Sequence, residues 1–175
     1  MAEVQTRWYI LYVYGGREMQ LCDYLNHVEN LYAFTIQKEV AHKRQGSMFT
    51  VLKPMFPSYI FVETLLDHAC FTQLFNRLRS EKGGLIKELK YDDEIPSLLP
   101  EERQYLERLV NSDKVVETSK GFVENDKVVI TEGPLMGYES SIVKIDRHQR
   151  KAELELRVLD NVLRVTVSLE IVKKI

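Results

Sequence analysis

Apolar residues near the start of the chain change from continuous to helical spacing, which separates a strand from a helix. Residues 8–14 read WYILYVY and precede Gly15 and Gly16, a combination typical of a buried strand that ends in a turn. Between Arg17 and Asn30 apolar side chains recur on one helical face, so we predict a helix there. Its apolar positions are Leu21, Tyr24, Leu25 and Val28.

The next segment returns to extended patterns, which then alternate with two further helices. Residues 33–43 and 49–55 flank a polar turn and predict a hairpin. Asp67 is a suitable N-cap for a helix that ends near Ser80, and Pro100 followed by two glutamates opens another helix. Two more strands are expected at residues 57–63 and 85–89. This order predicts an α+β fold in which helices cover one sheet.

A polar stretch then divides the chain. Between residues 111 and 120 the apolar periodicity fades, and beyond residue 121 only short alternating runs remain. Five such runs predict a small antiparallel β-barrel. The expected organisation is a first domain at residues 1–110, a linker at 111–120 and an all-β domain at 121–175. The five runs are residues 127–131, 141–146, 152–159, 163–168 and 171–174.

Composition excludes several classes of protein. The 175 residues include 24 Lys and Arg against 26 Asp and Glu, a net charge of −2, so a uniformly basic nucleic-acid coat is excluded while local basic patches are not. No apolar run approaches the roughly 20 residues that span a bilayer, and the N-terminus lacks a signal-peptide pattern. The two cysteines, Cys22 and Cys70, are expected to stay reduced. We therefore expect a cytoplasmic protein without membrane contact.

Motifs for catalysis, metals and cofactors are not evident. The chain has no phosphate-binding glycine loop, and its histidines and cysteines lack metal-ligand spacing. The acidic triplet at residues 92–94 is a weak candidate, because short charge runs are usually solvated loop. We expect neither enzymatic activity nor a cofactor or metal ion. The four histidines are His27, His42, His68 and His148.

Three segments carry specific motifs: residues 8–18, WYILYVYGGRE; residues 53–63, KPMFPSYIFVE; and residues 125–146, NDKVVITEGPLMGYESSIVKID. In this order they resemble the NusG family of transcription elongation factors, and the third is similar to a KOW motif. The resemblance implies an amino-terminal NGN-type antiparallel sheet with helices, followed by a small all-β KOW barrel. It also implies that Gly133, Pro134 and Gly137 form the KOW turn, where glycines serve the backbone rather than a contact.

The resemblance implies RNA polymerase as a partner. In the family, the region that matches the second segment docks on the clamp helices of the polymerase, and Phe56, Pro57 and Tyr59 match that motif best. Tyr9 and Tyr14 complete the aromatic set that we expect to bind polymerase. Aromatic anchors dominate protein interfaces, although packing in the core would account for the same residues.

The chain also departs from the housekeeping members of the family. Ser58 and Ser140 stand where glycine is common, and Leu159 replaces an aromatic residue linked to the ribosome or to the termination factor Rho. Residues 91–109, YDDEIPSLLPEERQYLERL, resemble the specialised antitermination paralogs, especially the LoaP group, whose members recognise RNA hairpins. The preferred interpretation is a specialised paralog that acts as a monomer.

Two basic clusters are candidates for binding nucleic acid. The first is expected at a hairpin tip in the otherwise neutral segment from residue 121 onward, where concentrated cations suit phosphate binding. The second lies on the amino-terminal hairpin, on the face that approaches upstream DNA in the family. A solvated hairpin tip would explain the first cluster equally well, and an exposed hairpin kept soluble by lysines is the slightly favoured explanation of the second. The first comprises Lys144, Arg147, His148, Arg150 and Lys151, and the second Lys38, Lys43, Arg44 and Lys53.

Three functions stay open. The preferred one is a processive antitermination factor that binds RNA polymerase and is recruited by a hairpin in the nascent transcript, with upstream DNA as a further candidate partner. The second is a general elongation factor that couples polymerase to Rho or to the ribosome, which Leu159 disfavours. The third is a ribosome-associated KOW module, which the complete amino-terminal domain disfavours.

Overall fold

The computed structural model describes residues 4–91 and 97–172 and divides the chain into two compact units. Unit 1 consists of Met1–Thr35 and Phe56–Arg103, and unit 2 of Ile36–Met55 and Gln104–Ile175. The hairpin segment at residues 36–55 therefore packs with the C-terminal half of the chain. The acidic triplet at 92–94 lies outside the described residues. The domain limits expected at residues 110 and 121 stay a prediction.

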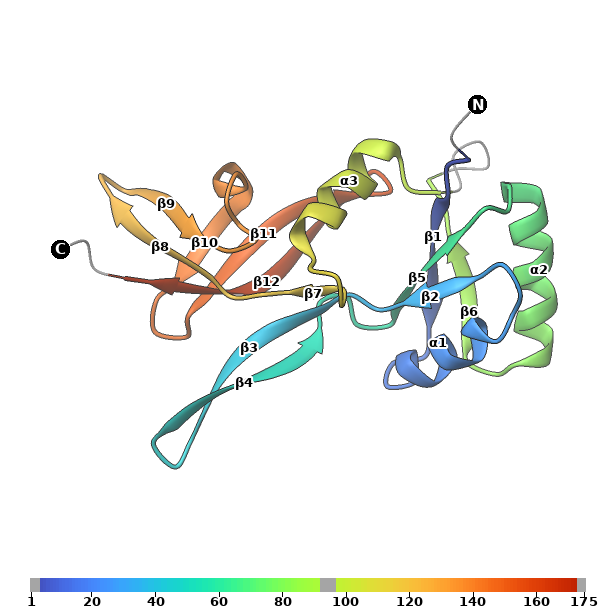
Figure 1. Ribbon diagram of the computed structural model, residues 1–175, viewed down its shortest axis with the longest axis horizontal. Helices are drawn as coiled ribbons and strands as arrows, with labels where there is room; N and C mark the ends of the chain where they lie inside the picture. The colour runs from blue at the N-terminus through green and yellow to red at the C-terminus, as the bar shows by residue number, and fades with distance from the viewer. Residues whose placement is uncertain (1–3, 92–96, 173–175) are drawn as a thin grey trace. The chain divides into compact units, whose positions relative to one another are not determined.

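Unit 1 is an antiparallel sheet with helices packed on it (Figure 1). Its strand order is β2-β5-β1-β6. Tyr9, Leu11 and Val13 alternate along β1 and face the buried side chains of the helices, whereas Trp8 faces the opposite way and meets the rings of Phe34 and Phe61. The elements are β1 (Arg7–Val13), α1 (Glu18–Asn26), β2 (Tyr32–Phe34), β5 (Tyr59–Thr64), α2 (His68–Glu81) and β6 (Leu85–Leu89).

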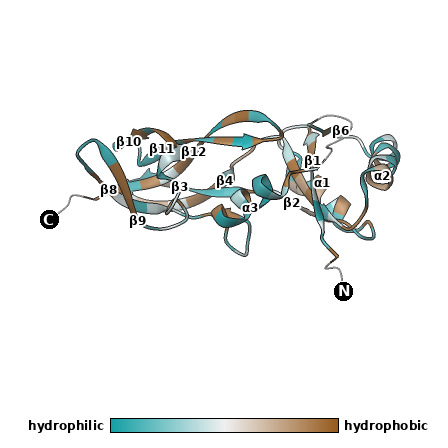
Figure 2. Ribbon diagram, turned by 90° about the horizontal axis from the view of Figure 1, so that it is seen from above, coloured by the Kyte–Doolittle hydropathy of each residue, from teal (hydrophilic) through white to brown (hydrophobic). Residues whose placement is uncertain are grey.

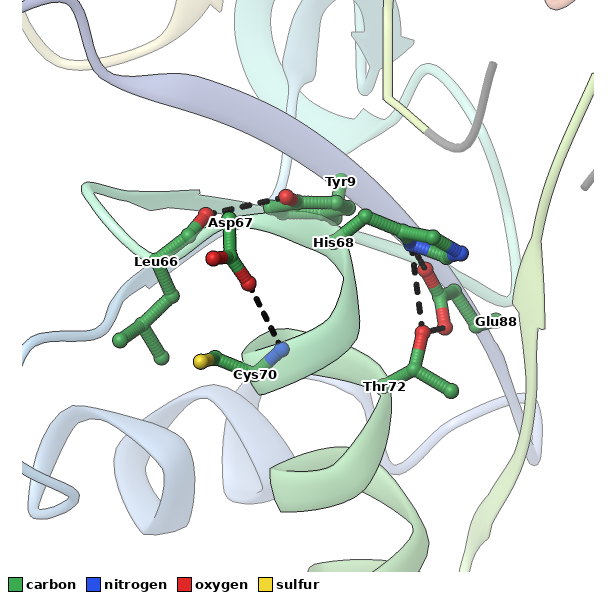
Figure 3. Close-up of polar contacts among 7 residues, drawn as sticks. All are labelled: Tyr9, Leu66, Asp67, His68, Cys70, Thr72 and Glu88. Carbon is green, nitrogen blue, oxygen red and sulfur yellow. Dashed lines mark hydrogen bonds and ion pairs between the residues drawn. The ribbon is translucent and has the colours of Figure 1, made fainter. Parts of the chain in front are cut away.

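Helix α2 begins where the sequence predicts. The Asp67 carboxylate accepts a hydrogen bond of 2.8 Å from the Cys70 backbone N–H, which confirms Asp67 as the N-cap (Figure 3). The same bond holds the pKa of Asp67 below its usual value. The third helix, α3 (Pro100–Leu109), begins at Pro100 as expected, and the boundary between the two units falls within it.

Unit 2 is all β apart from the end of α3 and a short 3-10 turn, η1 (Glu139–Ser141). One sheet has the order β10-β11-β12-β8-β9, and a second has the order β4-β3-β7. Hydrophobic and hydrophilic bands follow one another along these strands (Figure 2), and Ala152, Leu154 and Leu156 of β11 are buried at alternate positions. The strands are β3 (Gln37–Arg44), β4 (Ser47–Pro54), β7 (Val115–Val116), β8 (Ser119–Glu124), β9 (Lys127–Glu132), β10 (Ile142–Asp146), β11 (Lys151–Val158) and β12 (Asn161–Ile171).

Two strands of unit 2 differ from the sequence prediction. The run expected at 163–168 lies inside one longer strand, β12, which pairs with β11 over residues 161–168 and whose end pairs in parallel with β8. Strand β12 ends at Ile171, the first residue of the run expected at 171–174, and residues 173 and 174 lie outside the described residues. Strand β8 begins at Ser119, inside the stretch expected to be a linker, because Ser119 is fully buried and pairs with Leu169. The α+β class, an antiparallel sheet with helices followed by an all-β region, is confirmed.

Candidate functional site

The aromatic residues expected to bind polymerase divide into buried and exposed members. Tyr9 is fully buried, stacks on Phe71 at a centroid distance of 3.9 Å and donates a hydrogen bond of 3.0 Å to the Leu66 carbonyl (Figure 3). Burial raises the pKa of the Tyr9 hydroxyl to about 12. Phe56 is also buried and lies 5.7 Å from the Phe61 ring. Both pack within unit 1.

Tyr14, Pro57 and Tyr59 reach the surface. Tyr14 is 63% exposed, Pro57 is exposed and Tyr59 is partly exposed. The Val13 N–H donates a 2.8 Å hydrogen bond to the Ser58 carbonyl, so the chain around Tyr14 lies beside the chain around Pro57 and Tyr59. We call Tyr12, Tyr14, Pro57 and Tyr59 the aromatic patch.

Sequence analysis missed one member of this patch, Tyr12. It lies opposite Tyr59 in the β1–β5 register, and the two rings are 5.6 Å apart. Alternation along the strand could have indicated Tyr12, because residues two positions apart point to the same face. Tyr12 and Tyr14 therefore point to one face, and Tyr9 points to the other, which the helices cover. Parity alone does not decide exposure, because Trp8 and Ile10 share the parity of Tyr12 and are buried.

Ser58 adopts a backbone conformation that favours glycine. Its φ is +70°, in the left-handed region, and its N–H donates a 2.9 Å hydrogen bond to Glu18 Oε1. This conformation shapes the turn between Pro57 and Tyr59.

The basic residues of unit 2 are brought together in part. Lys38 and Lys53 face each other in the β3–β4 register, and the Lys38 ammonium donates to the Thr166 carbonyl of β12. A cavity of about 200 Å³ lies at this contact and is lined by both lysines and by Arg150 and Lys151. The structure thus joins two residues of each predicted basic cluster.

The other predicted basic residues lie outside this cavity. Lys144 lines a neighbouring hollow that also includes Lys151. Arg147 and His148 are exposed in the turn between β10 and β11, and Lys43 and Arg44 are exposed near the end of the β3–β4 hairpin.

The predicted KOW turn has a structural role. Gly133 has φ +99° and Gly137 has φ +84°, conformations that side chains rarely adopt. Between them Leu135 is fully buried, and its N–H donates a 3.0 Å hydrogen bond to Ser119 Oγ. Pro134, partly buried, precedes it. These residues shape the loop between β9 and β10.

A polar cluster in unit 1 was not expected from the sequence. His68 Nδ1 lies 3.6 Å from Glu88 Oε1, and the Thr72 hydroxyl donates a 2.9 Å hydrogen bond to Glu88 Oε2 (Figure 3). Burial of Glu88 raises the pKa of its carboxyl, and the Thr72 bond, Lys90 and His68 oppose that shift. The cluster joins α2 to β6. Within the described residues, no group of three or more His, Cys, Asp or Glu side chains could hold a metal ion.

Comparison with protein families places the chain. A family model described as "Transcription termination factor nusG" matches residues 6–102, more than half of the chain. The chain belongs to the NusG family. Members of the NusG family are transcription factors rather than enzymes, and the expectation that this chain is a NusG-type transcription factor is confirmed at that level.

One solved structure similar to this NusG-family chain is titled "Domain interaction in Thermotoga maritima NusG". It is 16% identical, with 95% of this chain and 94% of that chain covered and a TM-score of 0.49. No curated protein matches the chain. In the part of the chain that the structure describes, no helix has both the length and the apolar character needed to cross a bilayer.

Proposed function

We propose that this NusG-family protein is a specialised transcription factor that binds RNA polymerase and promotes processive antitermination after recruitment by an RNA hairpin. The observation that carries the proposal is the concentration of cations around Arg150 and Lys151 in a chain whose net charge is −2. Local positive charge in an otherwise acidic protein favours binding of nucleic acid at one place over non-specific binding across the whole surface.

The aromatic patch supports polymerase binding. Tyr14 and Tyr59 expose ring surface next to Pro57, and tyrosine is enriched among the residues that dominate binding energy at interfaces. Tyr9 and Phe56 are buried, so the contact is assigned to Tyr12, Tyr14, Pro57 and Tyr59. The docking element on polymerase is the clamp helices, and the complex forms in the cytoplasm.

Leu159 supports a specialised role over a general one. Its side chain is only 5% exposed, and with Asp160 it forms the two-residue turn between β11 and β12, both at positive φ. A buried aliphatic residue at this position offers no exposed aromatic ring to Rho or to a ribosomal protein. The general elongation factor is therefore the second candidate.

The test captures RNA polymerase on the full chain and sequences the transcripts that accompany it. We expect wild type to retain polymerase and a small set of transcripts that share a hairpin. Tyr14→Ala combined with Tyr59→Ala should weaken polymerase binding by about 1–3 kcal/mol for each lost anchor. Tyr32→Ala is the matched control, because Tyr32 is 49% exposed in the same unit but on β2.

The outcomes separate the candidates. Transcripts drawn evenly from all genes would support the general factor instead. Polymerase retention by the double variant equal to that of Tyr32→Ala would contradict the assigned surface. Thermal unfolding of each variant controls for loss of the fold.

A further inference from the structure

The cavity between the β3–β4 hairpin and strands β11 and β12, all within unit 2, is lined by cations that come from distant parts of the sequence. Lys38 and Lys53 contribute from the hairpin, Arg150 from the turn before β11, and Lys151 from the first position of β11. The Lys38 ammonium fixes one wall by donating to the Thr166 carbonyl. Four positive groups therefore share about 200 Å³ of space.

Within the described residues, these charges are not neutralised by the protein. The ion pairs among residues 4–91 and 97–172 include none of the four cations. Glu39 also lines the cavity, but its Oε2 accepts a 2.7 Å hydrogen bond from the Thr118 N–H. Burial and the positive charges of Lys151 and Lys53 lower the pKa of Lys38. Like charges held this close are unfavourable until an anion joins them.

The donor set suits a phosphate group. The three lysine ammonium groups act as point charges, and the arginine guanidinium can bind two phosphate oxygens at once. The cavity exceeds the roughly 30 Å³ that one water occupies in the liquid, so a tetrahedral oxyanion with its substituents fits. Gln149 and Ser168 on the same wall add neutral polar groups.

We propose that Lys38, Lys53, Arg150 and Lys151 form a pocket that binds one phosphate group, supplied by the backbone of a nucleic acid or by free phosphate. As a nucleic-acid contact the pocket rests on the proposed function, because it identifies which cations grip the RNA backbone. One phosphate group bound there would contact both the β3–β4 hairpin, through Lys38 and Lys53, and strand β11, through Lys151.

The experiment titrates the full chain, without polymerase, with two probes at constant ionic strength. Inorganic pyrophosphate reports the pocket alone, and a short RNA duplex of arbitrary sequence reports backbone contact. Binding is measured by calorimetry, and the unfolding temperature is recorded with and without pyrophosphate, since a ligand that binds the folded state raises it.

Two variants with the same loss of charge are compared. Lys38→Gln with Lys53→Gln removes the hairpin side of the pocket. Lys127→Gln with Arg157→Gln removes two exposed cations elsewhere in unit 2. We expect the pocket variant to bind both probes about tenfold more weakly or worse, and to lose the rise in unfolding temperature, while the control keeps both.

Each result bears on one claim. Weakening of both probes supports the pocket with RNA as its source of phosphate. Weakening of pyrophosphate alone supports the pocket with free phosphate as its source and counts against RNA recruitment at this place. Equal behaviour of the two variants overturns the pocket, and hairpin binding through Arg147 would still stand or fall by its own test. Retention of pyrophosphate binding by Lys38→Arg, which keeps the charge that Lys38→Gln removes, would show that the charge of Lys38 and not its packing is responsible for the binding.

Discussion

At the scale of single residues, burial decides which side chains keep their ordinary chemistry. Glu88 lies in β6 with its side chain 4% exposed, held by the Thr72 hydroxyl and beside His68. The raised pKa of Glu88 means that the folded protein binds this proton more tightly than the unfolded chain does. The sequence offers no sign of this, because Glu88 occupies an ordinary position in a short strand.

Glu88 should therefore make the protein less stable as pH rises. Above the usual glutamate pKa of 4.5 the unfolded chain releases the proton first, so the contribution of Glu88 to the free energy of unfolding falls until the folded carboxyl also ionises. Glu88→Gln retains an acceptor for Thr72 and removes the titration. Urea unfolding across this pH range should show that wild type loses stability relative to Glu88→Gln as pH increases. A constant difference between the two proteins would contradict the assignment.

At the scale of elements, the loop between β9 and β10 is fixed by two glycines that do different work. A Cβ at Gly133 would lie 2.7 Å from both Cα and Oγ of Ser119, the residue at which β8 begins. A Cβ at Gly137 would meet nothing within 4 Å. Gly133 therefore allows the loop to approach β8, whereas Gly137 only allows the turn.

The two glycines should differ in the cost of adding a methyl group. Gly137→Ala should lose about 1–2 kcal/mol, the cost of a left-handed conformation for an alanine. Gly133→Ala should lose that amount and about 1–3 kcal/mol more, because the Ser119 backbone must move. Chemical denaturation of the two variants measures the difference. Equal destabilisation would mean that the loop and β8 do not touch as described.

Most elements could be predicted because their signals are local. Asp67 caps α2, Pro100 opens α3, and the alternation of β11 identifies its buried face, each within a few residues. The start of β8 and the unbroken length of β12 could not be predicted, because each depends on a parallel pairing between Ser119 and Leu169 across 50 residues. Polar linkers and the ends of strands look alike when the partner is that distant.

The two candidate binding surfaces also differ in how far local signals in the sequence could predict them. Period-two alternation places Tyr9 and Tyr12 on opposite faces of β1, but it does not predict the aromatic patch, because Trp8 and Ile10 share the parity of Tyr12 and are buried. The meeting of Lys38 with Lys151 has no local signal in the sequence, because it arises only when the hairpin packs beside the barrel strands within unit 2.

At the scale of the whole molecule, the net charge is acidic, so the contribution of Arg147 and Arg150, in the turn between β10 and β11, to RNA binding can be measured through the salt dependence of that binding. Each phosphate contact contributes about 0.7–0.9 to the slope of log affinity against log salt concentration. Arg147→Ala with Arg150→Ala should therefore flatten that slope by about 1.5 for a cognate RNA hairpin. Filter binding at several salt concentrations gives the slope, with Lys127→Gln and Arg157→Gln as the control.

Polymerase capture should survive the two arginine changes, because Tyr14 and Tyr59 belong to unit 1 and the arginines to unit 2. Equal slopes for wild type and the double variant would make the turn a solvated loop and leave recruitment to Lys38, Lys43 and Arg44.

The parallel pairing of β12 with β8 also sets an order of events during synthesis. Unit 1 has all its residues once position 103 has been made, but unit 2 needs Ile171 to pair with Gly121. At ribosomal speeds those 68 residues take about 3–14 s. For most of that interval the β3–β4 segment, already made, lacks the Thr166 carbonyl of β12 to which Lys38 donates, so its place in unit 2 is completed only when the last strand of the chain has been made.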